Sequence, residues 1–229
     1  MTDLLDLIAR RDYSTESDVV RAMPMVLRIE RADPPSRTDV LEAAAAAAIA
    51  VCLDDRAAVD GEWHPALEAW IRGRIRKVSR RARGAHWAAV QELPGVTITV
   101  GTASVRAFVP GPVTELPKEL SRLQVAGSDL PPDTPGPVPE GARVLWVNPR
   151  VEMTAGKAAA QVGHATMILA PRLSAAELKE WAAVEFRTAV RTPSPADWDL
   201  LVAGPDPVVV RDAGFTEVAP GTATVAALL

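Results

Sequence analysis

The stretch "VLWVNPRVEMTAGKAAAQVGHATMILA", residues 144–170, sets a short run of β-favouring residues before a long alanine-rich run. The two patterns predict a strand at 143–149 and a helix at 155–170. We expect a further helix at 174–181, a strand at 184–191, a short helix around Trp198, and strands at 207–212 and 222–229. Strands that alternate with helices in this way indicate an α/β fold with a mixed sheet.

The first half of the chain repeats this order, because "MVLRIER" precedes "RTDVLEAAAAAAIAVCL". An offset of 111 residues places Trp70 on Trp181 and Trp87 on Trp198, and offsets of 119 and 120 superpose the first strands and the "GTASVRAF" and "GTATVAAL" runs. We therefore predict an internal duplication. Residues 1–125 would form a degenerate, non-catalytic copy with an N-terminal helix, residues 126–142 an extended proline-rich linker, and residues 143–229 the second unit.

Composition argues against a strongly basic protein, a disulfide-rich protein and a membrane protein. The chain has 229 residues, of which 48% are hydrophobic, and a formal net charge of −4, so its overall charge does not indicate a nucleic-acid binder. The single cysteine, Cys52, lies in an apolar run, which predicts a buried, inert thiol and no disulfide framework. The apolar run Ala43–Leu53 is too short to span a membrane, and "MTDLLDLIARR" is typical of an amphipathic helix. We expect a cytoplasmic protein without a membrane segment.

The alanine-rich helix carries one polar stripe. Lys157, Gln161 and His164 fall on one narrow face at helical spacing, whereas an apolar face contains Ala158, Val162, Ala165 and Leu169. At an offset of 119 the first copy has Thr38, Glu42 and Ala45 instead, so the fold alone does not require the stripe. The alternative is a solvated lysine, a neutral glutamine and a hydrogen-bonded histidine near the core.

A second polar cluster follows the strand at 207–212. In "VVVRDAGFTEVAPGTATV", residues 208–225, an apolar strand ends at Asp212, Gly214 permits a tight turn with positive φ, and Thr216 offers a hydroxyl. Pro220 and Gly221 then turn the chain into the last strand. A carboxylate at a strand end is a suitable place for chemistry, although such a residue often serves only as a turn cap.

"GKAAAQVGHA" (156–165), followed some fifty residues later by "DAGFTEVAPGTATV", resembles the type II peptidyl-tRNA hydrolase family over about residues 143–229. The resemblance implies an α/β fold with a four-stranded mixed sheet flanked by helices, a normally homodimeric enzyme, no cofactor, and hydrolysis of the ester between a peptide and the 3′ end of tRNA. By position it implies catalytic Lys157, Gln161, His164, Asp212 and Thr216. Gly156, Gly214, Gly221 and Thr222 would give the turns and the backbone their shape.

These residue types are compatible with ester hydrolysis, which needs an activated water, a group that stabilises the oxyanion and an anchor for the RNA. As hypotheses, Asp212 with Thr216 orients or deprotonates water, Lys157 stabilises negative charge, and Gln161 and His164 position the substrate. The three histidines, His64, His86 and His164, are scattered without metal-ligand spacing, so we expect no metal.

The sequence departs from the family pattern at Phe215, where the family commonly has arginine. The second half is also slightly acidic, with eight Lys and Arg against nine Asp and Glu in residues 143–229. "RGRIRKVSRRAR", residues 72–83, could supply the missing charge as a strip of phosphate contacts. Its cations are Arg72, Arg74, Arg76, Lys77, Arg80, Arg81 and Arg83. The alternative is a solvated edge strand whose charges prevent aggregation.

The sequence therefore predicts a peptidyl-tRNA hydrolase in which a degenerate copy and a catalytic unit form a pseudo-dimer within one chain. Further homo-oligomerisation is left open. Two other functions stay open as well: a non-catalytic RNA- or protein-binding module that retains the fold, and a hydrolase of another ester or amide.

Overall fold

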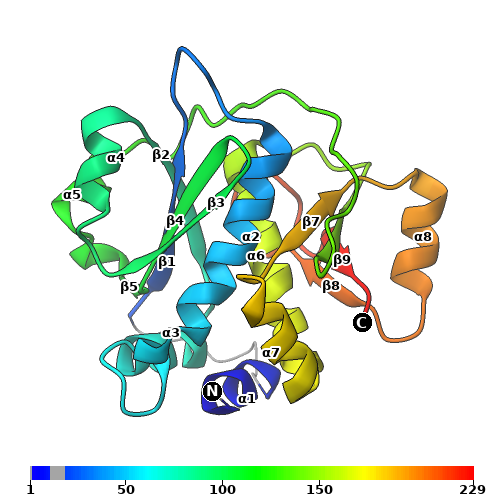
Figure 1. Ribbon diagram of the computed structural model, residues 1–229, viewed down its shortest axis with the longest axis horizontal. Coiled ribbons are helices and arrows are strands. Elements are labelled where there is room, and N and C mark those ends of the chain that lie inside the picture. Colours follow the sequence, from blue (N-terminus) through cyan, green and yellow to red (C-terminus); the bar gives the residue numbers. More distant parts are fainter. Residues whose placement is uncertain (1, 11–18) are drawn as a thin grey trace.

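The computed structural model describes residues 2–10 and 19–229, and the chain forms two α/β units, each built on its own sheet. In Figure 1 the two sheets lie on either side of two long helices, α2 (Arg37–Leu53) and α6 (Ala155–Leu169), which pack against each other. Residues of both helices belong to one hydrophobic core. The core is therefore shared by the two units.

The elements follow the order expected from the sequence. Before the first sheet lies α1 (Thr2–Ala9), the described part of the helix predicted at residues 1–11; residues 1 and 11 are outside the described residues. The first unit then contains β1 (Arg21–Arg28), α2, α3 (His64–Arg72), β2 (Lys77–Ala82), α4 (Gly84–Val90), β3 (Gly95–Val100), β4 (Ala103–Phe108), β5 (Gly111–Pro112) and α5 (Lys118–Ser121). The second contains β6 (Arg143–Val147), α6, α7 (Ala175–Ala183), β7 (Thr188–Arg191), α8 (Pro195–Ala203), β8 (Val208–Arg211) and β9 (Ala223–Ala227).

The two sheets have the same topology. The strand order is β2-β1-β4-β3 in the first unit, with the short β5 added beside β1, and β7-β6-β9-β8 in the second. In each sheet the first two strands of the chain pair in parallel and the other pairs are antiparallel. The predicted fold class, a mixed α/β sheet flanked by helices, is confirmed.

A tryptophan contact recurs in both units and supports the proposal of an internal duplication. The Trp70 indole Nε1 donates to the carbonyl of Arg76 at 3.1 Å, and the Trp181 Nε1 donates to the carbonyl of Arg187 at 2.8 Å. Each bond ties a helix to the residue just before the following parallel strand, six residues downstream. The spacing of 111 between the two tryptophans thus corresponds to equivalent positions in the two units.

The strand predicted at 184–191 is wrong at its start, because β7 begins only at Thr188. Glu185 and Phe186 have positive φ values of 54° and 56°, so the chain turns there. The Phe186 ring meets the Trp181 ring edge-on, with centroids 5.4 Å apart. This packing and the Trp181 hydrogen bond hold residues 184–187 in a tight turn after α7, where the alternation of the sequence indicated a strand.

Small residues allow the two long helices to approach closely. An ideal Cβ added to Gly163 of α6 would lie 3.0 Å from the Cβ of Ala48 in α2. The Thr166 hydroxyl donates to the carbonyl of Ala45 across the same contact, at 3.0 Å. The predicted apolar face of α6 is fully buried, as are the alanines at the centre of α2. The alanine-rich composition therefore serves contact between the units, so that the two units form one packed body within a single chain.

Cys52 in α2 is buried, as predicted. Burial raises the pKa of its thiol to about 12, so the reactive thiolate is not formed at neutral pH. In the part of the chain that the structure describes, no helix is long and apolar enough to cross a membrane.

The proline-rich segment 126–142 does more than connect the units. It runs along the top of the molecule in Figure 1, without regular helix or strand, from the first sheet to the second. Leu130 is buried in the shared core, and the Asp133 carboxylate accepts hydrogen bonds from the Ser36 hydroxyl and from the amide and hydroxyl of Thr38. The segment thus caps the start of α2.

We expect Asp133→Ala to lower the free energy of unfolding by about 1 kcal/mol at pH 7, because it removes a helix-capping carboxylate. Burial alone would raise the pKa of Asp133, but the hydrogen bonds from Ser36 and Thr38 together hold it below the ordinary value of 3.8. A lowered pKa means that the stabilisation is present above pH 3.8 and is lost as the pH falls through the folded-state pKa. Urea unfolding at pH 7 and pH 3 checks this, and an equal loss at both values would contradict it.

Candidate active site

A pocket of about 920 Å³ lies where the two units meet. Its walls come from α6, from the end of β8 with the turn that follows, and from residues 74–79 of the first unit. All five catalytic candidates line it: Lys157, Gln161, His164, Asp212 and Thr216. The structure therefore brings together the polar stripe of the helix and the glycine turn, which are some fifty residues apart in the sequence.

Lys157 and Asp212 form an ion pair at the centre of this site. The Lys157 Nζ lies 2.6 Å from Asp212 Oδ2, and the side chains are only 10% and 8% exposed. The same Nζ donates to the Thr216 hydroxyl at 2.9 Å. The Thr154 hydroxyl caps α6 by accepting from the Lys157 amide at 3.1 Å, so the lysine projects from the fixed first turn of the helix.

Gln161 links Asp212 to the last strand. Its Nε2 donates to Asp212 Oδ2 at 2.8 Å, and its Oε1 accepts from the Thr224 hydroxyl at 2.6 Å. The two bonds fix which way the amide points. Thr224 is not among the site residues predicted from the sequence, although it is the second threonine of the "GT.T" pattern at residues 221–224. The structure shows that its second threonine, on β9, faces Gln161, whereas Thr222 belongs to the turn.

The turn after β8 holds Asp212 in place. The Gly214 amide donates to Asp212 Oδ1 at 2.8 Å, and the backbone of Asp212 exchanges hydrogen bonds with Thr222 and Gly221 at 2.9 and 2.7 Å. Gly214 has φ +80°, and a Cβ there would lie 2.4 Å from Pro220 Cγ. Gly214, Gly221 and Thr222, which the sequence analysis proposed as supporting residues, all lie at this turn.

The beginning of α6 is tied to two other segments. The Gly156 amide donates to the Ser128 hydroxyl at 3.0 Å, and a Cβ on Gly156 would lie 2.6 Å from that oxygen. Glu217 accepts from the amide and the hydroxyl of Thr154, at 2.8 Å each. Glycine is thus required at position 156 because the segment 126–142 approaches the helix closely there. Glu217, in the turn after β8, bonds to Thr154, the residue that caps α6.

His164 lies one turn further along α6, on the pocket wall and apart from the Lys157–Asp212 hydrogen bonds. Its Nδ1 lies 3.2 Å from the Nζ of Lys77, which belongs to β2 of the first unit. Lys77 is only 9% exposed, and its Nζ lies 2.9 Å from the sulfur of Met167. Lys77 thus lies at the contact between the units and on the wall of the pocket, not on an exposed strip of phosphate contacts.

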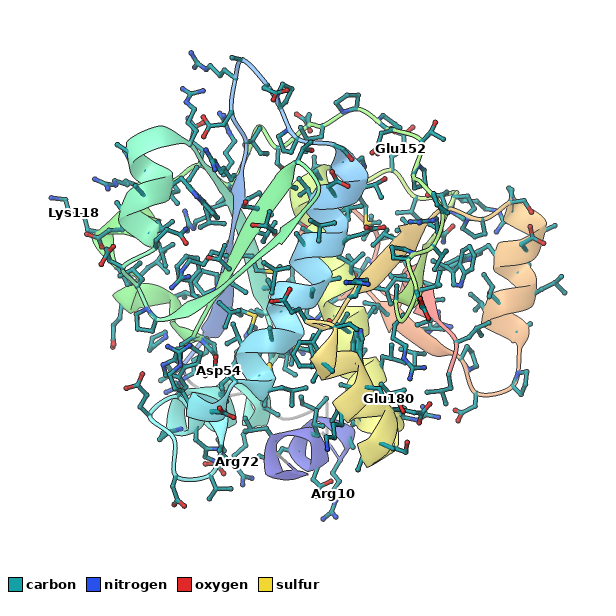
Figure 2. All side chains as sticks on the ribbon, viewed as in Figure 1. Arg10, Asp54, Arg72, Lys118, Glu152 and Glu180 are labelled. Carbon is teal, nitrogen blue, oxygen red and sulfur yellow. The ribbon has the colours of Figure 1, made fainter. Side chains whose placement is uncertain are left out.

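The remaining cations of residues 72–83 do not form one continuous strip. Arg72 pairs with Glu68 and lies at the periphery of the molecule in Figure 2. Arg80 and Arg81 donate to the carbonyls of Leu123 and Ala126, and Arg83 is half-buried. β2 is an edge strand, as the alternative interpretation expected, but it is not solvated, because Lys77, Ser79 and Ala82 are buried. Arg74 and Arg76, which precede it, line the pocket.

The pocket is positive although the chain is acidic. Five cations line it against two carboxylates, Asp212 and Glu217, and the cations are Arg74, Arg76, Lys77, Lys157 and Arg211. Three of the five come from the first unit. A concave surface with an excess of one sign of charge concentrates ligands of the opposite sign, so this pocket favours an anionic ligand.

The hydrogen-bond capacities define the chemistry that the cluster can perform. An ammonium group has three donors, of which Lys157 directs two to Asp212 and Thr216, so one remains for a developing oxyanion. Asp212 Oδ1 accepts one bond, from Gly214, and retains a lone pair for water. Within residues 2–10 and 19–229, no group of three His, Cys, Asp or Glu could hold a metal ion.

The second unit is thus an α/β domain in which a buried lysine–carboxylate pair opens into a positive pocket. Residues 142–229 match the family model described as peptidyl-tRNA hydrolase PTH2. The resemblance carried by the "GKAAAQVGHA" and "DAGFT" motifs is thus confirmed as a match of this part of the chain to that family's model. The first unit lies outside the match, and no curated protein and no solved structure matches the chain.

Proposed function

We propose that this protein is a peptidyl-tRNA hydrolase and that the Lys157–Asp212 pair with Gln161 is its catalytic centre. The observation that carries the proposal is the fixed hydrogen-bond network of these residues at a positive pocket, in a domain of a hydrolase family. The substrate is the ester between a peptide and the 3′ end of tRNA. Because this substrate arises in translation, the enzyme would act in the cytoplasm.

In the proposed reaction, water held at Asp212 Oδ1 attacks the carbonyl carbon of the ester. The carboxylate takes a proton from the water, and the negative charge that forms on the carbonyl oxygen is stabilised by the third N–H of Lys157. The bond from the carbonyl carbon to the ribose oxygen then breaks, and the proton passes to that oxygen. The products are a free peptide and a tRNA with a free terminal ribose hydroxyl.

Thr216 and Gln161 have supporting roles in this scheme. Thr216 accepts from Lys157 and so directs the remaining N–H of the ammonium group. Gln161, fixed by Thr224, donates to Asp212 Oδ2 and leaves Oδ1 for water. His164 lies on the pocket wall and contacts the substrate beyond the reacting ester.

We also propose that residues 1–125 are a degenerate copy without a catalytic centre. Of the positions that match Lys157 and Gln161, Thr38 is bonded to Asp133 and Glu42 to Val190 and Arg191, so both serve structural contacts. The copy replaces the second subunit of a homodimer. It supplies three of the five pocket cations.

The test is the release of labelled N-acetyl-aminoacyl groups from tRNA by the purified full-length protein, compared with hydrolysis of the ethyl ester of the same group. We expect rapid release from tRNA and a much lower kcat/KM for the ethyl ester. An equal kcat/KM for both esters would indicate a general esterase. Binding of tRNA without release would indicate an RNA-binding module.

A further inference from the structure

Phe215 occupies an unusual place for an exposed aromatic side chain. It lies on the turn between Asp212 and Thr216, at the pocket, and is 62% exposed. The turn is fixed on both sides, because Gly214 donates to Asp212 and Thr216 accepts from Lys157. The turn therefore keeps the Phe215 ring at the same pocket as Lys157 and Asp212, the groups that would act on the ester.

Two arginines of the first unit approach this ring. The guanidinium carbons of Arg74 and Arg76 each lie 5.8 Å from the Phe215 ring centroid, within the range of cation–π attraction. The backbone of Arg76 is anchored, since its carbonyl accepts from the Trp70 indole at 3.1 Å and from the Met23 amide at 2.9 Å. The cation that the sequence lacks at position 215 is thus replaced by two cations from the other unit.

An exposed ring beside two cations matches the chemistry of a single-stranded nucleotide. Aromatic side chains bind unpaired bases by stacking, and arginines contact the phosphates that link them. The ester cleaved in the proposed function is attached to the terminal ribose of an unpaired RNA end. The base on that ribose is close to the ester carbonyl in the substrate, and Phe215 is close to the Lys157–Asp212 pair in the protein. The base could therefore meet the ring while the carbonyl meets the pair.

We propose that Phe215, Arg74 and Arg76 form a nucleotide shelf, on which the 3′-terminal base of the tRNA stacks against the ring while the two arginines contact the adjoining phosphates. This inference rests on the proposed function for its choice of ligand. It makes the active site composite: the second unit supplies the reacting groups and the stacking ring, and the first unit supplies the phosphate contacts.

The first test separates the base from the rest of the substrate. The kcat/KM of the full-length protein is measured on the N-acetyl-aminoacyl ester of adenosine, which has the base but no phosphate, and on the corresponding ethyl ester. Phe215→Ala is expected to lower the ratio of the two values about tenfold through KM, because the base loses the ring on which it stacks. Phe215→Tyr restores the ratio, and Leu200→Ala, which alters an exposed apolar residue on α8, leaves it at the parent value.

The second test concerns the phosphates. Binding of deacylated tRNA is measured at several salt concentrations for the parent and for the double variant Arg74→Gln/Arg76→Gln. Loss of two phosphate contacts is expected to reduce the slope of log K against log salt by about 1.4. Arg28→Gln, which alters an exposed arginine paired with Glu30, keeps the parent slope.

Three results would overturn the shelf: a parent-like ester ratio in Phe215→Ala, failure of Phe215→Tyr to restore it, or an unchanged salt slope in the arginine variant. Failure of the proposed function would look different, because the parent would then hydrolyse none of the esters or would hydrolyse the tRNA ester and the ethyl ester equally well. In that case the binding of deacylated tRNA by Phe215→Ala still tests the nucleotide shelf. A tenfold weaker binding by Phe215→Ala supports the shelf, and parent-like binding rejects it.

Discussion

Asp212→Asn is expected to reduce the rate of peptide release from tRNA by at least about 100-fold, the range in which the loss of a general base falls. Asparagine keeps the size of the side chain and can still accept from Gly214, so the turn is preserved. It cannot take a proton from water, and it leaves the Lys157 ammonium without its counter-charge in a site that is only 8–10% exposed. Single-turnover release of labelled peptide at saturating enzyme measures the effect on the chemical step.

The control for Asp212→Asn is Asp197→Asn, on α8 and outside the residues that line the pocket. It is expected to release peptide within twofold of the parent. Circular dichroism and the binding of deacylated tRNA show whether the Asp212 variant is folded. A folded Asp212→Asn protein that retains more than a tenth of the parent rate would remove the proposed base.

Glu42→Ala is expected to lower the free energy of unfolding by about 3 kcal/mol, the cost typical of removing one partner of a buried ion pair. Glu42, on α2 of the first unit, is 6% exposed, and its Oε1 accepts from the Val190 amide at 3.0 Å and from Arg191 at 2.8 Å. Alanine would leave a nearly buried guanidinium without its carboxylate and a buried amide without its acceptor. The loss therefore acts on the contact between the units.

Urea unfolding with unchanged m-values measures this loss. The matched control is Glu68→Ala, which removes a carboxylate from the exposed pair with Arg72 and should cost less than about 1 kcal/mol. Glu42→Gln is expected to fall between the two, since its amide oxygen can still accept from Val190. A Glu42→Ala protein within 1 kcal/mol of the parent would contradict the role given to this pair.

Much of the fold could be predicted because its signals are local. The helix predicted over the alanine run "RTDVLEAAAAAAIAVCL" coincides with α2, and the helix predicted at 155–170 ends within one residue of α6. The start of β7 could not be predicted, because the turn at Glu185 and Phe186 depends on the contact between Phe186 and Trp181. Strand-like alternation continues through those residues regardless of that contact.

The site shows the same division between local and distant effects. Lys157, Gln161 and His164 share a helix face by spacing, so their grouping follows from helical geometry, and Gly214 indicated the turn at Asp212. No spacing within the second half could reveal Arg74 and Arg76, because they reach the pocket through the packing of one unit against the other. The same packing buries Lys77, which its sequence neighbours suggested would be a surface cation.

Glu42 and Gln161 show how the roles of corresponding positions differ between the two units. They occupy matching positions at an offset of 119 residues, on α2 and α6. Gln161 faces Asp212 and the pocket, whereas Glu42 binds the edge of the other unit's sheet at Val190 and Arg191. We infer that the first unit carries a residue for the contact between the units at the position where the second unit carries a residue of the site.

If Lys157 and Asp212 act as one unit in the hydrolysis of peptidyl-tRNA, the effects of substituting them should not be independent. The single-turnover rate of peptide release is measured for the parent, Lys157→Met, Asp212→Asn and the double variant. We expect release by the parent, losses of about 100-fold or more in each single variant, and a double variant no slower than the slower single one. No release by a folded parent that binds tRNA, or losses that multiply in the double variant, would contradict the joint role of Lys157 and Asp212.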